Sequence, residues 1–114
     1  MDWNLYIDDS SNKAESGAGV ILERDQGTQL ELSLRFEFLA SNNQAEYEAL
    51  LAGLKLAREV GAQKLAILSD SQVVTSQIEG SYQAKDSTMK KYLDKTREQL
   101  KKFMGYEIRH IPWE

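Results

Sequence analysis

A chain of 114 residues is long enough for one domain with one hydrophobic core. Its 41% hydrophobic and 28% charged residues are typical of a folded globular protein, and no apolar run approaches the roughly 20 residues that a membrane helix needs. The sequence has no cysteine and one histidine, which excludes disulfide scaffolds, thiolate metal sites and multi-histidine zinc centres. Any metal site must therefore use oxygen ligands, which suit magnesium, calcium or manganese.

The net charge of −4 is unusual for a protein that binds nucleic acid by electrostatics alone. A polyanionic partner would therefore need local positive charge or bound metal ions. The first residues lack the basic-then-apolar pattern of a secretory signal, so we expect an intracellular protein, in the cytoplasm or nucleus, without a membrane partner. Because no internal repeat or linker is visible, we expect a single domain over residues 1–114.

The first part of the chain predicts an antiparallel meander of three strands. Residues 3–8 form a short apolar strand that the turn-forming residues 9–12 end. A second strand is predicted over 17–23. Residues 29–38 alternate apolar and polar side chains strictly, as a half-buried strand does.

The second part predicts helices and two more strands. Ser41 or Asn42 caps a long helix that runs to about residue 60, with Gly61 as its stop. The apolar run 64–69 is typical of a strand that pairs in parallel. The remaining predicted elements are helices over 70–78 and 87–103 and a strand over 106–111. The resulting order, βββαβααβ, indicates a mixed α/β domain.

The predicted helix over 87–103 has a basic outer side, although two acidic residues dilute it. Its cations are Lys90, Lys91, Lys95, Lys101 and Lys102. A solvated helix face explains this pattern, and a surface that contacts phosphate groups explains it as well.

Three carboxylates are candidates for a functional site, and each has an ordinary alternative. Asp8 could start the turn after its strand, and Asp70 could cap the helix that follows it. Glu46 is harder to explain, because helical spacing aligns it with Leu50 and Leu54 on the side that must face the sheet. A buried carboxylate is costly unless it is paired or metal-bound, and an ion pair with a lysine or arginine is its ordinary alternative.

The predicted fold brings these three carboxylates together. Ligands of open α/β sheets gather at the carboxyl ends of parallel strands, where Asp8 and Asp70 lie and where the helix carrying Glu46 begins. Crowded carboxylates repel one another, and raised pKa values or bound cations relieve that repulsion. Two magnesium ions held in this way can activate water, polarise a phosphodiester and stabilise the leaving oxygen. The sequence therefore predicts a two-metal site.

Three blocks in chain order resemble the signature blocks of type 1 ribonuclease H: YIDDSS at 6–11, SNNQAEY at 41–47 and SDSQ at 69–72. Three further segments, at 17–20, 45–54 and 109–112, are most similar to the ribonuclease H domains of plant gypsy-type long-terminal-repeat retrotransposon polyproteins and their domesticated relatives. The resemblance covers the whole chain. It implies a ribonuclease H-like fold, a five-stranded mixed sheet whose first three strands are antiparallel, flanked by helices.

The resemblance also implies an activity, the metal-dependent endonucleolytic hydrolysis of the RNA strand of RNA–DNA hybrids. Asp8, Glu46 and Asp70 would be the catalytic, metal-binding residues, with Mg²⁺ or Mn²⁺ as the cofactor. Contacts with the hybrid would come from Ser10, Asn42, Asn43, Ser71 and Gln72. Short amides and hydroxyls can meet 2′-hydroxyls in a wide minor groove without reading sequence. The ordinary alternative for the two asparagines is helix capping, and we expect one of them to cap.

The chain departs from the family pattern in two places. Asp9 stands where family members normally carry glycine, and the family continues beyond the His-x-Pro segment into a helix with a fourth catalytic aspartate, whereas this chain stops at Glu114. We therefore expect a C-terminally truncated domain with impaired activity and an open apolar face that favours self-association. The alternative function is that of a catalytically inactive nucleic-acid-binding or protein-interaction module derived from a retroelement.

Overall fold

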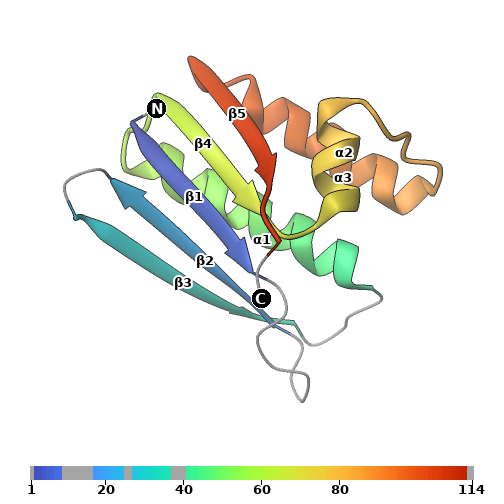
Figure 1. The fold of residues 1–114 in the computed structure, drawn as a ribbon, viewed down its shortest axis with the longest axis horizontal. Coiled ribbons are helices and arrows are strands. Elements are labelled where there is room, and N and C mark those ends of the chain that lie inside the picture. Colours follow the sequence, from blue (N-terminus) through green and yellow to red (C-terminus); the bar gives the residue numbers. More distant parts are fainter. Residues whose placement is uncertain (1, 9–16, 25–26, 37–40, 113–114) are drawn as a thin grey trace.

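The computed structural model describes residues 2–8, 17–24, 27–36 and 41–112. Its elements follow the predicted order βββαβααβ (Figure 1). They are β1 (Trp3–Asp8), β2 (Gly17–Arg24), β3 (Gln29–Arg35), α1 (Asn42–Glu59), β4 (Lys64–Ser69), α2 (Gln72–Glu79), α3 (Ser87–Leu100) and β5 (Gly105–His110).

The five strands form one mixed sheet in the order β3-β2-β1-β4-β5. β1 pairs antiparallel with β2, and β2 with β3, whereas β1 and β4, and β4 and β5, are parallel. The predicted mixed sheet, with its first three strands antiparallel, is confirmed. Because β1 and β4 are parallel neighbours, their carboxyl ends lie next to each other at one edge of the molecule (Figure 1).

The hydrophobic core lies between the sheet and α1, which crosses one face of the sheet. Leu5 and Ile7 alternate along β1 toward this core and are fully buried. Gly53 allows the close approach of the helix, because a Cβ atom there would lie 2.8 Å from Cδ1 of Leu5. The helix and the central strand are thereby held in close contact.

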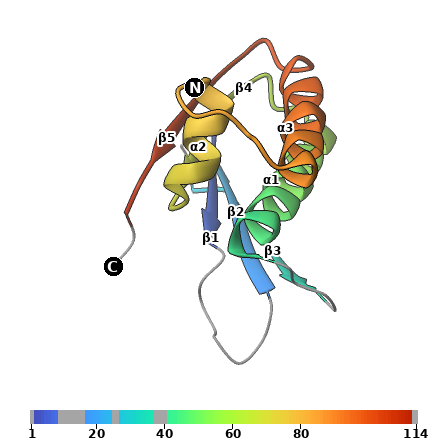
Figure 2. The same ribbon diagram turned by 90° about the vertical axis from the view of Figure 1, so that its right-hand side faces the viewer.

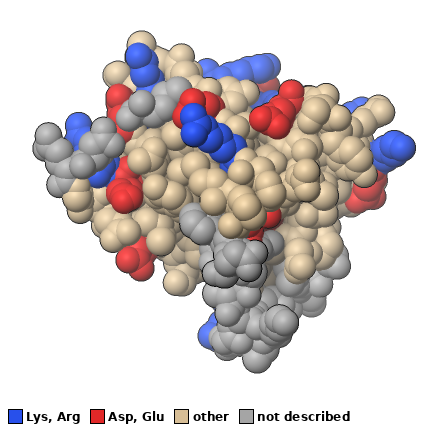
Figure 3. Space-filling view, viewed as in Figure 1, with Lys and Arg blue, Asp and Glu red and all other residues tan. Residues whose placement is uncertain are grey.

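The three helices pack against one another, and α1 and α3 lie side by side (Figure 2). None of the helices in the described ranges is long and apolar enough to cross a lipid bilayer. On the sheet face away from α1, Tyr6 has Ile21 and Leu68 as its neighbours on the adjacent strands, and all three are half-buried. Charged side chains are sparse over much of this face (Figure 3).

Three predicted elements need corrected bounds. α2 begins at Gln72 rather than at residue 70, because Ser71 is its N-cap. α3 ends at Leu100 rather than at about residue 103, because the backbone N–H groups of Met104 and Gly105 donate to the carbonyl oxygen of Gln63, at 2.8 and 3.4 Å. These bonds lead the chain into β5, which begins and ends one residue earlier than predicted. The last residues of the predicted third strand, 37 and 38, lie outside the described residues.

Candidate active site

The backbones of two of the predicted acidic residues end neighbouring parallel strands. Ile7 of β1 and Ser69 of β4 are paired across the sheet. Asp8 follows Ile7 as the last residue of β1, and Asp70 directly follows β4. The side chain of Asp8 lies outside the described part of the structure, so its convergence with the other carboxylates stays a prediction.

Glu46 is fully buried, with 0% of its side chain exposed, at the second turn of α1. Leu50, Leu54 and Ala57 continue its line along the helix and are buried against the sheet, as the helical spacing predicted. The hydroxyl of Ser69 donates a hydrogen bond to Oε2 of Glu46. A carboxylate on α1 is thus tied to the last residue of β4, directly before Asp70.

A network of hydrogen bonds shapes the turn between β4 and α2. The backbone N–H of Ser71 donates to Oγ of Ser69 at 3.1 Å, so Ser69 contacts both this turn and Glu46. Ser71 is the N-cap of α2, since its Oγ accepts from the backbone N–H of Val74 at 3.1 Å. The alternative in which Asp70 caps the helix is therefore wrong. Its Oδ1 atom is shielded from solvent beside the end of β4.

Four of the five residues expected to contact a hybrid lie at the N-termini of α1 and α2. Asn42 and Gln72 are exposed, and the Ser71 hydroxyl donates to Oδ1 of Asn43 at 3.4 Å, which links the two helix ends. The fifth, Ser10, lies outside the described residues.

Neither asparagine caps α1. Oγ of Ser41 accepts from the backbone N–H of Gln44 at 3.2 Å, so Ser41 is the cap. The expectation that Asn42 or Asn43 caps the helix is wrong, because the shorter serine side chain directly before the first helical residue takes that position. Both amides therefore remain candidates for ligand contact.

Comparisons with known proteins assign the chain to a family. The profile of the family described as reverse transcriptase-like matches residues 8–114. The crystal structure of RNase H1 from the halophilic archaeon Halobacterium salinarum NRC-1 is similar, with a TM-score of 0.85 and 30% sequence identity over 96% of this chain and 85% of that chain. The chain belongs to the ribonuclease H-like family.

The sequence comparison finds the same archaeal enzyme, and a further relative carries the same family name. Ribonuclease HI of Halobacterium salinarum is 37% identical over 73 residues, which cover 64% of this chain and 37% of that protein. The structure of LC11-RNase H1 in complex with an RNA/DNA hybrid has a TM-score of 0.83 and 25% identity, over 96% of this chain and 85% of that one. The chain spans only about half, or less, of the length of the curated relatives that it matches.

The donor set of this ribonuclease H-like chain suits a hard divalent cation. Glu46 and Asp70 present carboxylate oxygens beside the end of β4, and magnesium and manganese prefer such ligands. Within the described residues no group of three or more acidic, histidine or cysteine side chains is placed to hold a metal ion. The third predicted ligand, the side chain of Asp8, is not part of that described set. Glu46 and Asp70 fit the metal-binding role, and Asp8 is predicted to complete the site.

Ser69 was not among the site residues predicted from the sequence. Ser69 is 1% exposed and bonds both Glu46 and the Ser71 backbone. Alternation along the strand offered a signal, because Leu65 and Ile67 face the core and the next residue on that side is Ser69. A hydroxyl on the buried side of a strand needs a hydrogen-bond partner.

A second polar link connects the helices behind the site. The hydroxyl of Tyr47, the residue after Glu46, donates to Oε1 of Gln77 on α2 at 2.6 Å, and Nη2 of Arg97 on α3 donates to the Gln77 carbonyl at 3.1 Å. The Tyr47 ring stacks on Tyr92, with centroids 5.6 Å apart. Gln77 therefore joins all three helices, and Tyr47 couples the backbone around Glu46 to α2.

Both stacked tyrosines should make the protein sensitive to alkali. Burial raises the pKa of Tyr47 from 10.0 to about 12, and the hydrogen bond to Glu48, followed by burial, raises the pKa of Tyr92 to about 12. The folded protein holds these protons more tightly than the unfolded chain, so the stabilisation is complete below pH 10 and is lost as the pH rises toward 12. We expect the free energy of unfolding, measured in urea, to fall over this interval.

The Tyr47→Phe variant tests that expectation. Removing the hydroxyl should lower stability at pH 7, because Oε1 of buried Gln77 loses its donor, and should shrink the loss between pH 10 and 12. Tyr82→Phe is the matched control, since Tyr82 is 55% exposed. A Tyr47→Phe variant with an unchanged alkaline profile would show that Tyr47 is not responsible for it.

Proposed function

We propose that this chain hydrolyses the RNA strand of RNA–DNA hybrids endonucleolytically and requires Mg²⁺ or Mn²⁺. The observation that carries the proposal is the fully buried Glu46, held by the Ser69 hydroxyl next to Asp70 at the carboxyl end of the parallel strands. Supporting it, ribonuclease HI of Halobacterium salinarum is similar in both sequence and structure, and the similar LC11-RNase H1 was crystallised with an RNA/DNA hybrid.

Asp8, Glu46 and Asp70 would hold the metal ions. Bound there, divalent ions supply an activated water and neutralise charge on the phosphodiester. The chain itself holds the ligands in position: Ser69 orients Glu46, and the turn that Ser71 closes sets the direction of Asp70. A buried, pre-oriented ligand loses little conformational freedom when the metal binds.

The hybrid would lie across the N-termini of α1 and α2. Asn42, Asn43, Ser71 and Gln72 offer amides and hydroxyls there, and Ser10 is predicted to add another. Helix N-termini also attract phosphate groups, which helps a chain whose net charge is −4. These groups would contact sugar and phosphate, so we expect cleavage with little sequence preference.

A cleavage assay on end-labelled substrates tests the function. The protein is incubated with an RNA–DNA hybrid, duplex RNA or duplex DNA, with magnesium and then with manganese. We expect cutting of the RNA strand of the hybrid only, leaving 3′-hydroxyl and 5′-phosphate ends. Asp70→Asn should abolish it, whereas Glu59→Gln, which removes an exposed carboxylate from the end of α1, should not.

The same assay distinguishes the proposed nuclease from the alternative function, an inactive nucleic-acid-binding module. If the folded protein binds the hybrid without cutting it with either metal, this chain is not a nuclease by itself, and an inactive nucleic-acid-binding module becomes the better description. In that case, a fusion that adds a C-terminal helix carrying an aspartate distinguishes the two remaining possibilities. A truncated enzyme should then cut the hybrid, whereas an inactive module should not. The single domain over 1–114, its truncation and an intracellular location stay predictions.

Two finer proposals accompany this function. The segments at 45–54 and 109–112 support an origin in a gypsy-type retrotransposon polyprotein. We also propose self-association through the sheet face that carries Tyr6, Ile21 and Leu68, because no helix in the described residues covers it (Figure 1). Analytical ultracentrifugation over a range of concentrations checks this: a monomer at every concentration contradicts it, and Leu68→Glu should weaken any dimer.

A further inference from the structure

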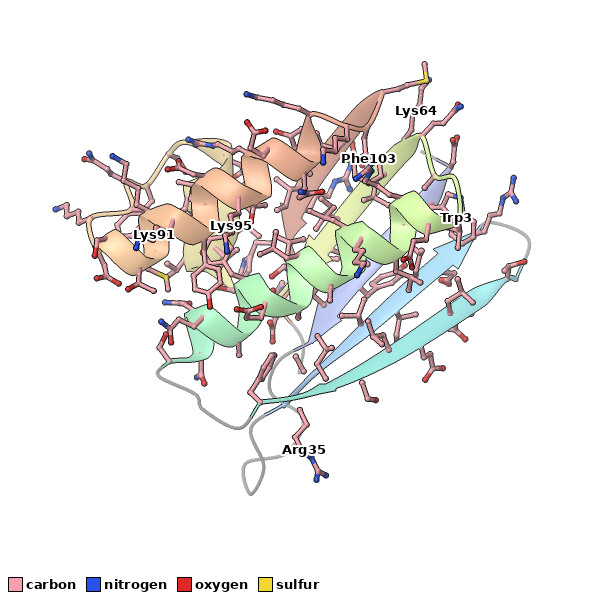
Figure 4. All side chains as sticks on the ribbon, turned by 180° about the vertical axis from the view of Figure 1, so that it is seen from behind. Trp3, Arg35, Lys64, Lys91, Lys95 and Phe103 are labelled. Carbon is pink, nitrogen blue, oxygen red and sulfur yellow. The ribbon has the colours of Figure 1, made fainter. Side chains whose placement is uncertain are left out.

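A groove runs along the seam between α1 and α3, on the side of the molecule seen in Figure 4. Its lining residues are Leu51, Lys55 and Arg58 of α1 and Lys95, Glu98 and Gln99 of α3. None of them belongs to the carboxylate site or to the predicted hybrid contacts. The groove is therefore a separate feature of the surface.

The groove is positively charged, although the chain is acidic. It has three cations, Lys55, Arg58 and Lys95, and one acid, Glu98, so its local charge is +2, against −4 for the whole chain. Oε2 of Glu98 lies 3.7 Å from Nζ of Lys101, so this acid is also shared with a cation outside the groove. All three groove cations are exposed, and in the described ranges none of them forms an ion pair.

The groove continues into a second hollow through Lys95. Both hollows include this residue, and the second adds Lys91, one helical turn earlier on α3 and about 6 Å away along the axis. Figure 4 shows both lysines on α3 beside α1. This second hollow also contains two acids, Glu48 and Asp94, so its two lysines are balanced. Glu48 accepts a hydrogen bond from the Tyr92 hydroxyl at 2.6 Å. A row of cations thus lines the seam, and its excess of positive charge lies in the first groove, where three cations accompany one acid.

The row begins near the catalytic end of the molecule. Arg58 lies 12 residues beyond Glu46 on α1, which is about 18 Å along the helix axis. That length corresponds to about five phosphates of one strand at 3.4 Å each. We propose that this groove binds the phosphate backbone of a nucleic-acid strand that extends from the catalytic end along α1 and α3. The choice of nucleic acid as the polyanion rests on the proposed function.

Removing the groove cations tests the proposal in a protein that cannot cut. In an Asp70→Asn background, the triple variant Lys55→Gln, Arg58→Gln, Lys95→Gln is compared with a control triple at exposed lysines outside the groove. The control changes are Lys64→Gln, Lys85→Gln and Lys102→Gln. Each triple removes three positive charges, so the general charge effect is matched. Fluorescence anisotropy measures binding of a labelled hybrid at several salt concentrations.

We expect the groove triple to weaken binding of the hybrid at least tenfold. It should also reduce the slope of log affinity against log salt by roughly two to three, because each lost phosphate contact lowers that slope by about 0.7 to 0.9. The control triple should change the slope by less than one such contact. The difference between the triples should disappear with hybrids too short to reach the groove from the carboxylate site. Equal slopes for the two triples on long hybrids overturn the proposal.

A competition experiment distinguishes a groove that binds a nucleic-acid strand from one that binds a small phosphate ligand. If a nucleoside monophosphate at equal phosphate concentration displaces the hybrid as well as an oligonucleotide does, the groove is a site for small phosphates and the strand proposal fails. Should a triple variant not fold, the single variants Lys55→Gln and Lys64→Gln make the same comparison. Groove-dependent binding without any cleavage by the unmodified chain would reject the proposed nuclease and leave the groove assignment intact.

Discussion

Replacing Glu46 with glutamine should reduce cleavage of a hybrid at least about a hundredfold while leaving the fold as stable as before. The amide keeps the volume of the buried side chain and can still accept the hydrogen bond from Ser69, but it lacks the charge that a metal ligand supplies. Burying a charge opposes folding, so its removal should not lower the melting temperature. A residue kept for function at a cost in stability behaves in this way.

Cleavage rates over a magnesium titration and thermal unfolding without metal measure the two effects separately. Glu59→Gln is the control, because it removes a carboxylate from the exposed side of the same helix. Magnesium should raise the melting temperature of the unmodified protein and of the control more than that of Glu46→Gln. A large loss of stability in Glu46→Gln, with activity reduced only in proportion to the folded fraction, would assign Glu46 a structural role instead.

The burial of Glu46 could be predicted because it depends on a local pattern. A helix repeats every 3.6 residues, so the apolar positions at Leu50 and Leu54 define which side of α1 faces the sheet, and Glu46 continues that line. Parallel pairing of the strand that follows α1 was predicted from a similar local argument, since a helix before an apolar strand favours it. The pattern did not identify the partner strand, because α1 connects β3 to β4, whereas β4 pairs with β1. Both predictions use information contained in one or two consecutive elements.

The hydrogen bonds around the site could not be predicted in that way. Aspartate and serine are both favoured as N-caps, so the sequence alone does not choose between Asp70 and Ser71. The choice is made by Ser69, which accepts from the Ser71 backbone and ties the turn to Glu46, 23 residues earlier in the chain. Tyr47 and Gln77 are 30 residues apart, and no periodicity pairs them.

The positive groove could not be predicted from the sequence either, because its cations come from two separate helices. The basic side of α3 was visible in the sequence, and a solvated face was the favoured explanation over a surface that contacts phosphate groups. The structure adds the two cations of α1, Lys55 and Arg58, which line one groove with Lys95. Helix packing therefore brings together charges that are separated by about 40 positions in the sequence, and only this arrangement favours a bound phosphate backbone over a solvated face.

Replacing Ser69 with alanine should slow cleavage about ten- to hundredfold and raise the magnesium concentration needed for half-maximal activity. The hydroxyl donates to Oε2 of Glu46 and accepts from the backbone N–H of Ser71, so its loss leaves the carboxylate less firmly held and the turn before α2 with an unsatisfied donor. Because Ser69 is 1% exposed, water does not readily replace these bonds, and we expect a loss of about 1–2 kcal/mol in the free energy of unfolding.

The magnesium dependence of cleavage by Ser69→Ala shows whether Ser69 positions Glu46 or only stabilises the fold. If Ser69 positions Glu46, saturating magnesium should restore part of the activity of Ser69→Ala, and Ser69→Thr, which keeps the hydroxyl, should need close to the normal magnesium concentration. Ser76→Ala is the matched control, since this serine lies on α2 away from the carboxylates. An unchanged magnesium requirement in Ser69→Ala, measured on fully folded protein, would show that the hydroxyl does not prepare Glu46 for the metal. Oxygen ligands for magnesium must meet a nearly ideal octahedral geometry, so a carboxylate with one bond fewer should bind more weakly even when its charge is unchanged.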